Sequence, residues 1–181
     1  EIFRQGGRAV RLAGPGPNCL LAEPLRLEGD DGEAVELGRV GHVVEVDTGM
    51  IESAYAEGQI PVLPSVARGR DGGLFNVNAD TAAAAVARIL GAEKLVFLTD
   101  VRGVMTDPRD ADSLLSTVHV DEVGDLIARD IIKGGMIPKV EACVHSVKAG
   151  VRKTHVIDGT IPHSMLLEVF TDAGVGTQIV Q

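Results

Sequence analysis

Two short segments place polar or glycine-rich residues at the start of a predicted helix. Asn76, Asn78 and Asp80 precede an alanine-rich stretch, and Gly134-Gly135 leads through Pro138 to Lys139. The first turn of a helix has N–H groups without intrahelical partners and carries the positive end of the helix dipole, and both attract anions. Together the two segments predict a site that handles phosphate.

Lys139 is the candidate catalytic cation of the second segment. It follows Pro138, a residue type favoured in the first turn of a helix, so we expect its ammonium near the exposed N–H groups of that turn. A fixed positive charge beside free donors suits a phosphoryl group in transfer, because that reaction is catalysed mainly by positioning and charge neutralisation. The ordinary alternative is a lysine on the solvated surface.

The polar residues of the first segment also have two interpretations. Asn76 and Asn78 lie two apart, so in an extended segment both face the same way. Two amides on one face can hydrogen-bond a carboxylate or an amide of a small ligand. Asn and Asp are also common helix caps, which accounts for one residue among Asn76, Asn78 and Asp80 but not for all three.

The elements after residue 76 alternate in type. We predict helices at 80–90, 121–132, 138–149 and 162–170, and strands at 94–100, 154–159 and 176–181. Strands that alternate with helices and read as continuous apolar runs indicate a mainly parallel sheet covered on both faces. The expected fold class is therefore α/β, a three-layer αβα sandwich.

Residues 8–75 read instead as short strands and tight turns. We predict strands at 8–13, 19–29, 35–40 and 42–48, a turn at 29–32, a helix at 48–57 that stops at Gly58, a buried strand at 60–67 and a turn at 71–73. The Gly-Pro stretch at 14–17 should only reverse the chain. We place a lobe boundary near residue 88, which gives an acceptor-binding lobe at 1–88 and a nucleotide-binding lobe at 89–181.

Polar and small residues follow the predicted strands at the edge where ligands gather. In open α/β sheets ligands bind beyond the carboxyl ends of the strands. Residues 99–104 follow one such strand, Asp158-Gly159 follows another, and Gly134-Gly135 precedes the helix of Lys139. All three segments are expected to surround one nucleotide.

Bulk properties exclude several classes of function. The chain has 17 basic and 26 acidic residues, a formal charge of −9, and no basic stripe, so neither nucleic acid nor a membrane surface is an expected partner. The longest apolar run is broken by Arg88 and Gly91 before it could span a bilayer. Two cysteines, Cys19 and Cys143, fit a reducing compartment, so we expect a cytoplasmic protein, with a plastid as the alternative.

Other site chemistries find no support in the sequence. No glycine-rich stretch ends in Gly-Lys-Ser/Thr, the P-loop signature. Cys143 and His145 point different ways on a predicted helix and no second pair completes a zinc set, so no metal site is expected. Any Mg²⁺ would arrive on the phosphates of a nucleotide.

Five motifs resemble the second half of the acetylglutamate kinases, a branch of the amino-acid kinase family. They are FNVNAD (75–80), KLVFLTDVRGV (94–104), IIKGGMIPKVEA (131–142), HVIDG (155–159) and HSMLLEVFTDAGVGT (163–177). The resemblance covers essentially the whole chain. It implies that ATP phosphorylates the side-chain carboxylate of N-acetyl-L-glutamate in arginine biosynthesis.

The resemblance also implies roles for particular residues. Asn76 and Asn78 would contact acetylglutamate, Asp80 would orient catalytic lysines, and Lys139 would neutralise the transferring phosphoryl group. The implied nucleotide residues are Thr99, Asp100, Val101, Gly135 and Met136. Arginine-inhibited members share a histidine, a glutamate and a Gly-x-Gly turn, which here are His163, Glu168, Gly174 and Gly176. A homo-oligomer and a nitrogen-signalling partner would fit the same branch.

Two departures and three alternatives accompany the resemblance. The family's first half, with a further catalytic lysine and glycine-rich loops, has no counterpart here, so we expect a fragment that is inactive alone. Residues 14–18 also lack the Lys-Asp turn that the family has there. The acceptor could instead be aspartate, glutamate or carbamate. The chain could also be a non-catalytic nucleotide or arginine sensor, or an assembly surface.

Overall fold

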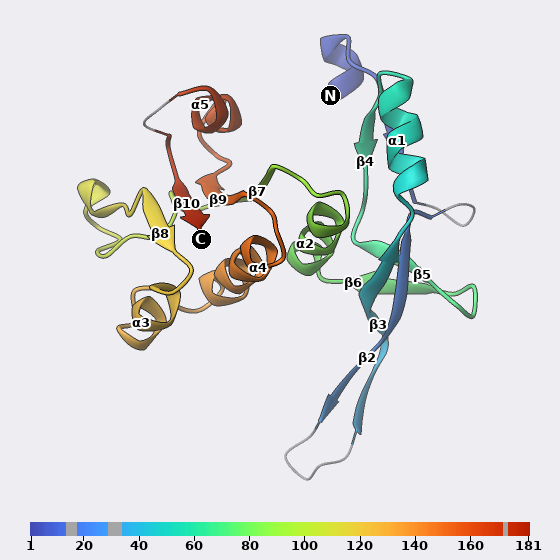
Figure 1. The fold of residues 1–181 in the computed structure, drawn as a ribbon, viewed down its shortest axis with the longest axis horizontal. Helices are drawn as coiled ribbons and strands as arrows, with labels where there is room; N and C mark the ends of the chain where they lie inside the picture. The colour runs from blue at the N-terminus through green and yellow to red at the C-terminus, as the bar shows by residue number, and fades with distance from the viewer. Residues whose placement is uncertain (14–17, 29–33, 172–173) are drawn as a thin grey trace. The chain divides into compact units, whose positions relative to one another are not determined.

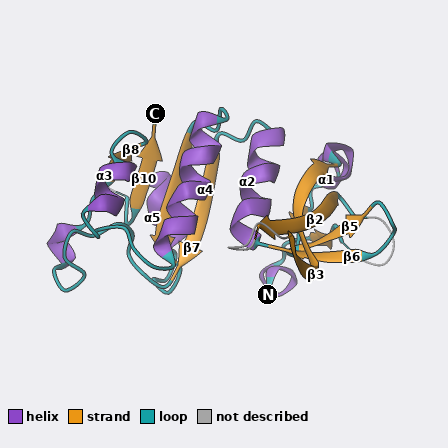
Figure 2. Ribbon diagram, turned by 90° about the horizontal axis from the view of Figure 1, so that it is seen from below, coloured by secondary structure: helices purple, strands orange, loops and turns teal. Residues whose placement is uncertain are grey.

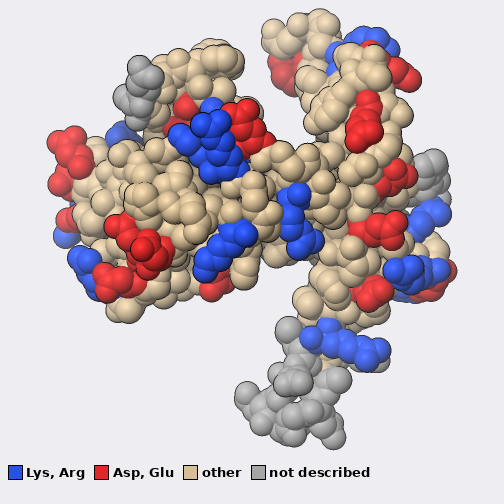
Figure 3. Space-filling model, viewed as in Figure 1, with Lys and Arg blue, Asp and Glu red and all other residues tan. Residues whose placement is uncertain are grey.

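The structure of the chain is a computed structural model that describes residues 1–13, 18–28, 34–171 and 174–181 (Figure 1). The chain divides into two compact units, residues 1–89 and 90–181. The predicted turns at 14–17 and 29–32 lie outside the described residues. Figure 3 shows basic and acidic side chains interspersed on the visible face of the described part.

The first unit contains two separate β structures. Its elements are the 3₁₀ turn η1 (Ile2–Gln5), strands β1 (Ala9–Arg11), β2 (Leu20–Glu28) and β3 (Ala34–Val46), helix α1 (Thr48–Ala56), strands β4 (Ile60–Val62), β5 (Val66–Gly69) and β6 (Leu74–Val77), and helix α2 (Ala79–Ile89). Strands β1 and β4 form a two-stranded parallel sheet. Strands β2, β3, β6 and β5 close into a small barrel.

Three of the strands predicted in this unit differ from the structure. The strands expected at 35–40 and 42–48 are one 13-residue strand, β3, which pairs with β2 on both sides of Gly41. The buried strand expected at 60–67 is two strands separated at Pro64, and Ile60 and Val62 of β4 are exposed. A proline lacks the N–H that a continuous ladder requires, so the pairing changes there.

The helices of the first unit follow their predicted signals. Helix α1 begins at the Asp47 cap, whose carboxylate accepts the Met50 N–H, and the chain leaves it at Gly58 with φ of 67°. Helix α2 buries Ala82 and Ala87 and packs on β3. Both helices lie within one residue of the predicted bounds.

The second unit is a three-layer arrangement. Its elements are β7 (Lys94–Thr99), η2 (Ala111–Ser113), β8 (Thr117–His119), α3 (Val123–Ala128), α4 (Met136–Lys148), β9 (Lys153–Asp158), α5 (Ser164–Phe170) and β10 (Thr177–Val180). The sheet has the order β7-β9-β10-β8, and only the β9–β10 pair is antiparallel. Helices α4 and α5 pack on opposite faces of this sheet, which agrees with the predicted αβα class (Figures 1 and 2).

The core of this unit lies between α4 and the sheet. Helix α4 contributes Val140, Cys143 and Val147, and the sheet contributes Val156 and Ile179, all nearly inaccessible. The helix predicted at 121–132 is only the six-residue α3, and β8 was not predicted. A three-residue strand gives too short a pattern to recognise without its partner β10.

Candidate functional site

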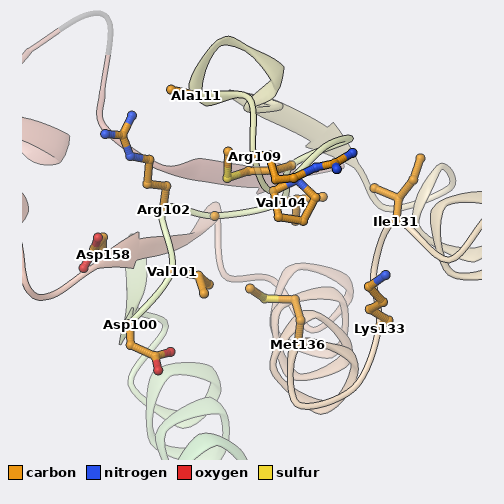
Figure 4. A pocket seen from close by; sticks show the side chains of 13 residues that line it. Asp100, Val101, Arg102, Val104, Arg109, Ala111, Ile131, Lys133, Met136 and Asp158 are labelled. Carbon is orange, nitrogen blue, oxygen red and sulfur yellow. The ribbon is translucent and has the colours of Figure 1, made fainter.

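A pocket of about 510 Å³ lies in the second unit, beyond the ends of two parallel strands (Figure 4). Volumes of this order suit small-molecule ligands. Its lining comes from the segment after β7, the loop before η2, the segment before α4 and the end of β9: Asp100, Val101, Arg102, Gly103, Val104, Met105, Pro108, Arg109, Ala111, Ile131, Lys133, Met136 and Asp158.

Strand pairing brings the two acidic residues of the pocket to the same edge. Thr99, the last residue of β7, is the register partner of Asp158, the last residue of β9. The Gly159 N–H donates to the Thr99 carbonyl at 2.8 Å, which fixes the two strand ends together. Asp100 therefore leaves β7 beside Asp158, as expected for the carboxyl ends of adjacent parallel strands.

The pocket carries both signs of charge. Its lining includes three cations, Arg102, Arg109 and Lys133, against two carboxylates, Asp100 and Asp158. The Thr160 hydroxyl donates to Asp158 at 2.6 Å and the Thr160 N–H at 2.8 Å. These hydrogen bonds, with the nearby Arg102 charge, lower the pKa of Asp158 and keep it ionised at neutral pH.

Apolar side chains occupy the middle of the pocket. Figure 4 shows Val101 and Met136 turned toward each other, with Lys133 on the Met136 side. Lys133 lies 3.3 Å from Asp130 in an exposed ion pair. An apolar slot bordered by cations suits a planar ring that carries an anionic group.

One wall of the pocket was missed in the sequence. This wall consists of Met105, Pro108, Arg109 and Ala111, to which the sequence analysis assigned no role. Ser113 closes the loop that contains these residues, because its hydroxyl donates to the Asp107 carbonyl at 2.7 Å. The turn-forming Asp107-Pro108 pair was the available local signal.

Among the predicted nucleotide residues, Asp100, Val101 and Met136 line the pocket and two lie just outside its lining. The Thr99 hydroxyl donates to Asp100 at 3.2 Å, so Thr99 supports a pocket residue. Gly135 is the cap residue before Met136 at the start of α4.

The start of α4 is organised differently from the simple anion site expected. The Met136 N–H donates to the Lys133 carbonyl at 3.1 Å and the Ile137 N–H to the Gly134 carbonyl at 3.2 Å, so both donors are already engaged. Pro138 does occupy the first turn. Lys139 is half-buried and its Nζ lies 5.7 Å from the centre of the Phe97 ring, a cation–π distance.

The predicted acceptor residues belong to the first unit. Asn76 and Asn78 are exposed and alternate with the buried Phe75 and Val77, so they share one face, as the spacing indicated. Asn78 is also the cap of α2, because its side-chain oxygen accepts the Thr81 N–H at 3.0 Å.

Asp80 lies in the first turn of the same helix. It is half-buried there, and an acidic residue in this position is stabilised by the helix dipole. The capping role thus falls to Asn78, which leaves Asn76 and Asp80 without a capping explanation.

A second cluster of polar groups forms around Glu168 on α5. Its buried carboxylate accepts the His155 Nδ1 at 2.7 Å, the Val175 N–H at 2.7 Å and the Gly176 N–H at 3.1 Å. Desolvation opposes the charge, but these donors outweigh it and the pKa of Glu168 falls below its ordinary value. His155 is also buried, and its Nε2 has no hydrogen-bond partner within the described residues.

The other residues expected to bind arginine lie around this cluster. His163 is exposed and caps α5 in a left-handed conformation, with φ of 61°. Gly174 has φ of 61°, and a Cβ there would lie 2.9 Å from the Glu168 carboxylate. His155, which the sequence analysis did not assign, is the histidine that contacts Glu168, because β9 and α5 bring together residues 13 apart.

The described residues show neither a metal cluster nor a membrane-crossing helix. They contain no group of three or more His, Cys, Asp or Glu side chains placed to hold a metal ion. None of the helices in the described part is long and apolar enough to cross a membrane.

Residues 13–158 match the model of the amino acid kinase family. The chain belongs to this family. The match includes the barrel of the first unit and the β7 and β9 strand ends that border the pocket.

Bacterial proteins named acetylglutamate kinase match nearly the whole chain. The acetylglutamate kinase of Synechococcus sp. is 47% identical over 180 residues, which cover 99% of this chain and 58% of the relative. That of Moorella thermoacetica is 46% identical and covers 99% of this chain and 62% of the relative. The chain thus spans about 60% of the length of these relatives.

Solved structures share the fold. N-acetylglutamate synthase from Neisseria gonorrhoeae, complexed with coenzyme A and L-arginine, has a TM-score of 0.82 at 27% identity, over 96% of this chain and 38% of that one. Carbamate kinase from Giardia lamblia bound to AMP-PNP has a TM-score of 0.58 at 17% identity, over 87% of this chain and 52% of that one, and shows the fold alone.

Proposed function

We propose that this chain forms the nucleotide-binding unit and part of the acceptor-binding unit of an ATP-dependent acetylglutamate kinase. The observation that carries the proposal is the pocket at the ends of β7 and β9, with its cationic border, in a chain 46–47% identical to enzymes of that name. The reaction would transfer the γ-phosphoryl group of ATP to the side-chain carboxylate of N-acetyl-L-glutamate, as a step of arginine biosynthesis in the cytoplasm.

The pocket supplies the features that an adenine nucleotide needs. Val101 and Met136 offer apolar faces for the base, and Lys133 and Arg109 offer charge to the phosphates. Asp100 and Asp158 offer acceptors to sugar hydroxyls. Mg²⁺ bound to the phosphates would neutralise charge on them, and the chain needs no metal site of its own for this role.

On the acceptor side, Asn76 carries the clearest binding role. Its exposed amide on β6 is available to hydrogen-bond the acetyl or carboxyl groups of the substrate. Asn78 would share this role while it caps α2, and Asp80 would orient cationic side chains near the reacting groups.

The chemical step needs no covalent intermediate on the enzyme. A carboxylate oxygen of the acceptor attacks the γ-phosphorus, the bond to the bridging oxygen of ADP breaks, and an acyl phosphate and ADP are formed. Two anions must approach each other, so charge neutralisation is the main task of the protein. We assign it to Lys139, whose ammonium lies 5.7 Å from the centre of the Phe97 ring.

Feedback inhibition by arginine belongs to the same proposal. Glu168 accepts three hydrogen bonds, and a carboxylate offers about four acceptor positions, so room for one guanidinium N–H remains. His163, Gly174 and Gly176 complete the proposed site. A homo-oligomer and a nitrogen-signalling regulatory partner are further expectations of this assignment.

The deciding experiment uses the full-length enzyme, ATP and Mg²⁺, with hydroxylamine to trap acyl phosphate. N-acetyl-L-glutamate, aspartate, glutamate and carbamate are compared as acceptors, and arginine is added in a separate series. Product with N-acetyl-L-glutamate alone is the expected result. Product with another acceptor would reassign the substrate, and no product with any acceptor would favour a nucleotide or arginine sensor.

A further inference from the structure

The segment from Asp100 to Val104 forms one side of the candidate nucleotide pocket, yet it is held from outside the pocket. Thr177, the first residue of β10, does not line the pocket and is completely buried. Its hydroxyl oxygen accepts the Val104 N–H at 2.8 Å, although the two residues are 73 positions apart. Val104 is itself 2% exposed, so this N–H has no access to water as an alternative acceptor.

The same threonine sets the path of the residue before Val104. Gly103 has φ of 145°, a conformation that side chains rarely adopt. A Cβ at Gly103 would lie 2.5 Å from the Thr177 Oγ1 and 3.0 Å from its backbone nitrogen. The segment therefore passes directly over Thr177, and only a glycine allows this approach.

Thr177 is in turn fixed on its own strand. It pairs with Val156 of β9 in the antiparallel ladder. The two preceding residues, Val175 and Gly176, donate their N–H groups to the buried Glu168 carboxylate. The position of the hydroxyl is thus determined by the sheet on one side and by Glu168 on the other.

We propose that Thr177 is a positioning residue for nucleotide binding, which holds the Asp100–Val104 side of the pocket in its binding shape through the Val104 N–H. The inference rests on the proposed function. Without the hydroxyl, the Val104 N–H has no acceptor in its present place, and the segment must shift to find one. Residues of the segment such as Val101 then leave the geometry that faces Met136.

The test compares isosteric variants by their affinity for a fluorescent ATP analogue, with the full-length protein held well below its unfolding temperature. Thr177→Val removes the hydroxyl, so the segment must leave its binding shape to satisfy the Val104 N–H. A binding shape populated in about a tenth of the molecules raises the dissociation constant about tenfold. Thr177→Ser keeps the hydroxyl and should restore affinity close to wild type.

The chain offers a matched control on the neighbouring strand. Thr154 of β9 is also completely buried, but its hydroxyl has no hydrogen-bond partner in the described part of the chain. Thr154→Val should leave the dissociation constant unchanged. If Thr177→Val does not fold, Thr177→Ala removes the same hydroxyl with a smaller side chain and should raise the dissociation constant by a similar factor, with Thr154→Ala as its control.

The outcomes separate the inference from the function on which it rests. A wild-type protein that binds no nucleotide would overturn the proposed function and the inference with it. A wild-type protein that binds, with equal affinity in Thr177→Val or an equal loss in Thr154→Val, would overturn the inference alone.

Discussion

Replacement of Glu168 by glutamine tests how the end of the second unit is stabilised. The side chain of Glu168 is 5% exposed, and its carboxylate accepts hydrogen bonds from His155, Val175 and Gly176. Glutamine has nearly the same shape but no charge, and its NH₂ group would face a donor. We expect Glu168→Gln to lower the free energy of unfolding at pH 7 by about 2–4 kcal/mol, since charged hydrogen bonds contribute about 1.5–3 kcal/mol each and one acceptor oxygen is retained.

The pH dependence of this effect has a definite sign. The pKa of Glu168 is lower in the folded chain than its ordinary value of 4.5. Its stabilising contribution is therefore complete above pH 4.5 and is lost as the pH falls through the folded-state pKa. The stability difference between wild type and Glu168→Gln should stay constant from pH 7 to about pH 5 and narrow in more acidic solution.

Thermal and urea unfolding at several pH values measure this difference. A change of 2–4 kcal/mol corresponds to roughly 5–10 °C in Tm for a chain of this size. The matched control is Glu141→Gln, because Glu141 is an exposed residue of α4. Equal Tm values for the two variants at pH 7, or a difference that widens in acid, would refute the reasoning.

Three further predictions concern single residues. Asn78→Ala removes the cap of α2 and should lower the free energy of unfolding by about 1 kcal/mol. Asn78→Ser keeps a capping oxygen, so it should keep this stability and only raise KM for N-acetyl-L-glutamate. Gly176→Ala should lower Tm, because the added Cβ would clash with the Val156 carbonyl. The control is Gly124→Ala in α3, where a Cβ has open space; thermal unfolding should show it to be neutral or stabilising by up to about 1 kcal/mol. Lys139→Ala in the full-length enzyme should lower kcat by about 10²–10³-fold, while the circular dichroism spectrum stays that of the folded wild type. An unchanged kcat would show that Lys139 takes no part in the chemical step.

Local patterns were sufficient to predict the helices that matter most. The alanine-rich α2 and helix α4, with Pro138 in its first turn, carry helical periodicity and start signals within their own segments. The continuous apolar run of β7 likewise predicted a strand of a mainly parallel sheet and hence the strand-end location of the pocket.

Features that depend on pairing between distant segments were not predictable in the same way. In the barrel, β3 pairs with β6 at Val40 and Gly41, where the sequence predicted a break between two strands, and no local signal marks the continuity of β3 there. The three-residue β8 is a strand only beside β10. Short strands take their identity from their partners, so a single sequence under-determines them.

In the candidate sites, too, residues marked by a local pattern were predictable from the sequence, and contacts between distant segments were not. Asp100, Val101 and Met136 lie beside element ends and line the pocket, while their binding of a nucleotide stays a prediction. The contacts of Glu168 with His155 and of Thr177 with Val104 join residues far apart along the chain, and only the sheet order brings them together. Sequence reasoning therefore missed the contact of His155 with the glutamate. The assignment of His163 to an arginine site stays a prediction.

Steady-state kinetics of two variants of the full-length enzyme test most directly whether the acceptor binds to the first unit and ATP to the pocket of the second. Asn76→Ala should raise KM for N-acetyl-L-glutamate at least several-fold and leave KM for ATP unchanged, because it removes only an exposed amide. Val101→Glu should do the reverse, because it places a negative charge in the nucleotide pocket. The account is contradicted if Val101→Glu leaves KM for ATP unchanged, or if each variant affects both substrates alike.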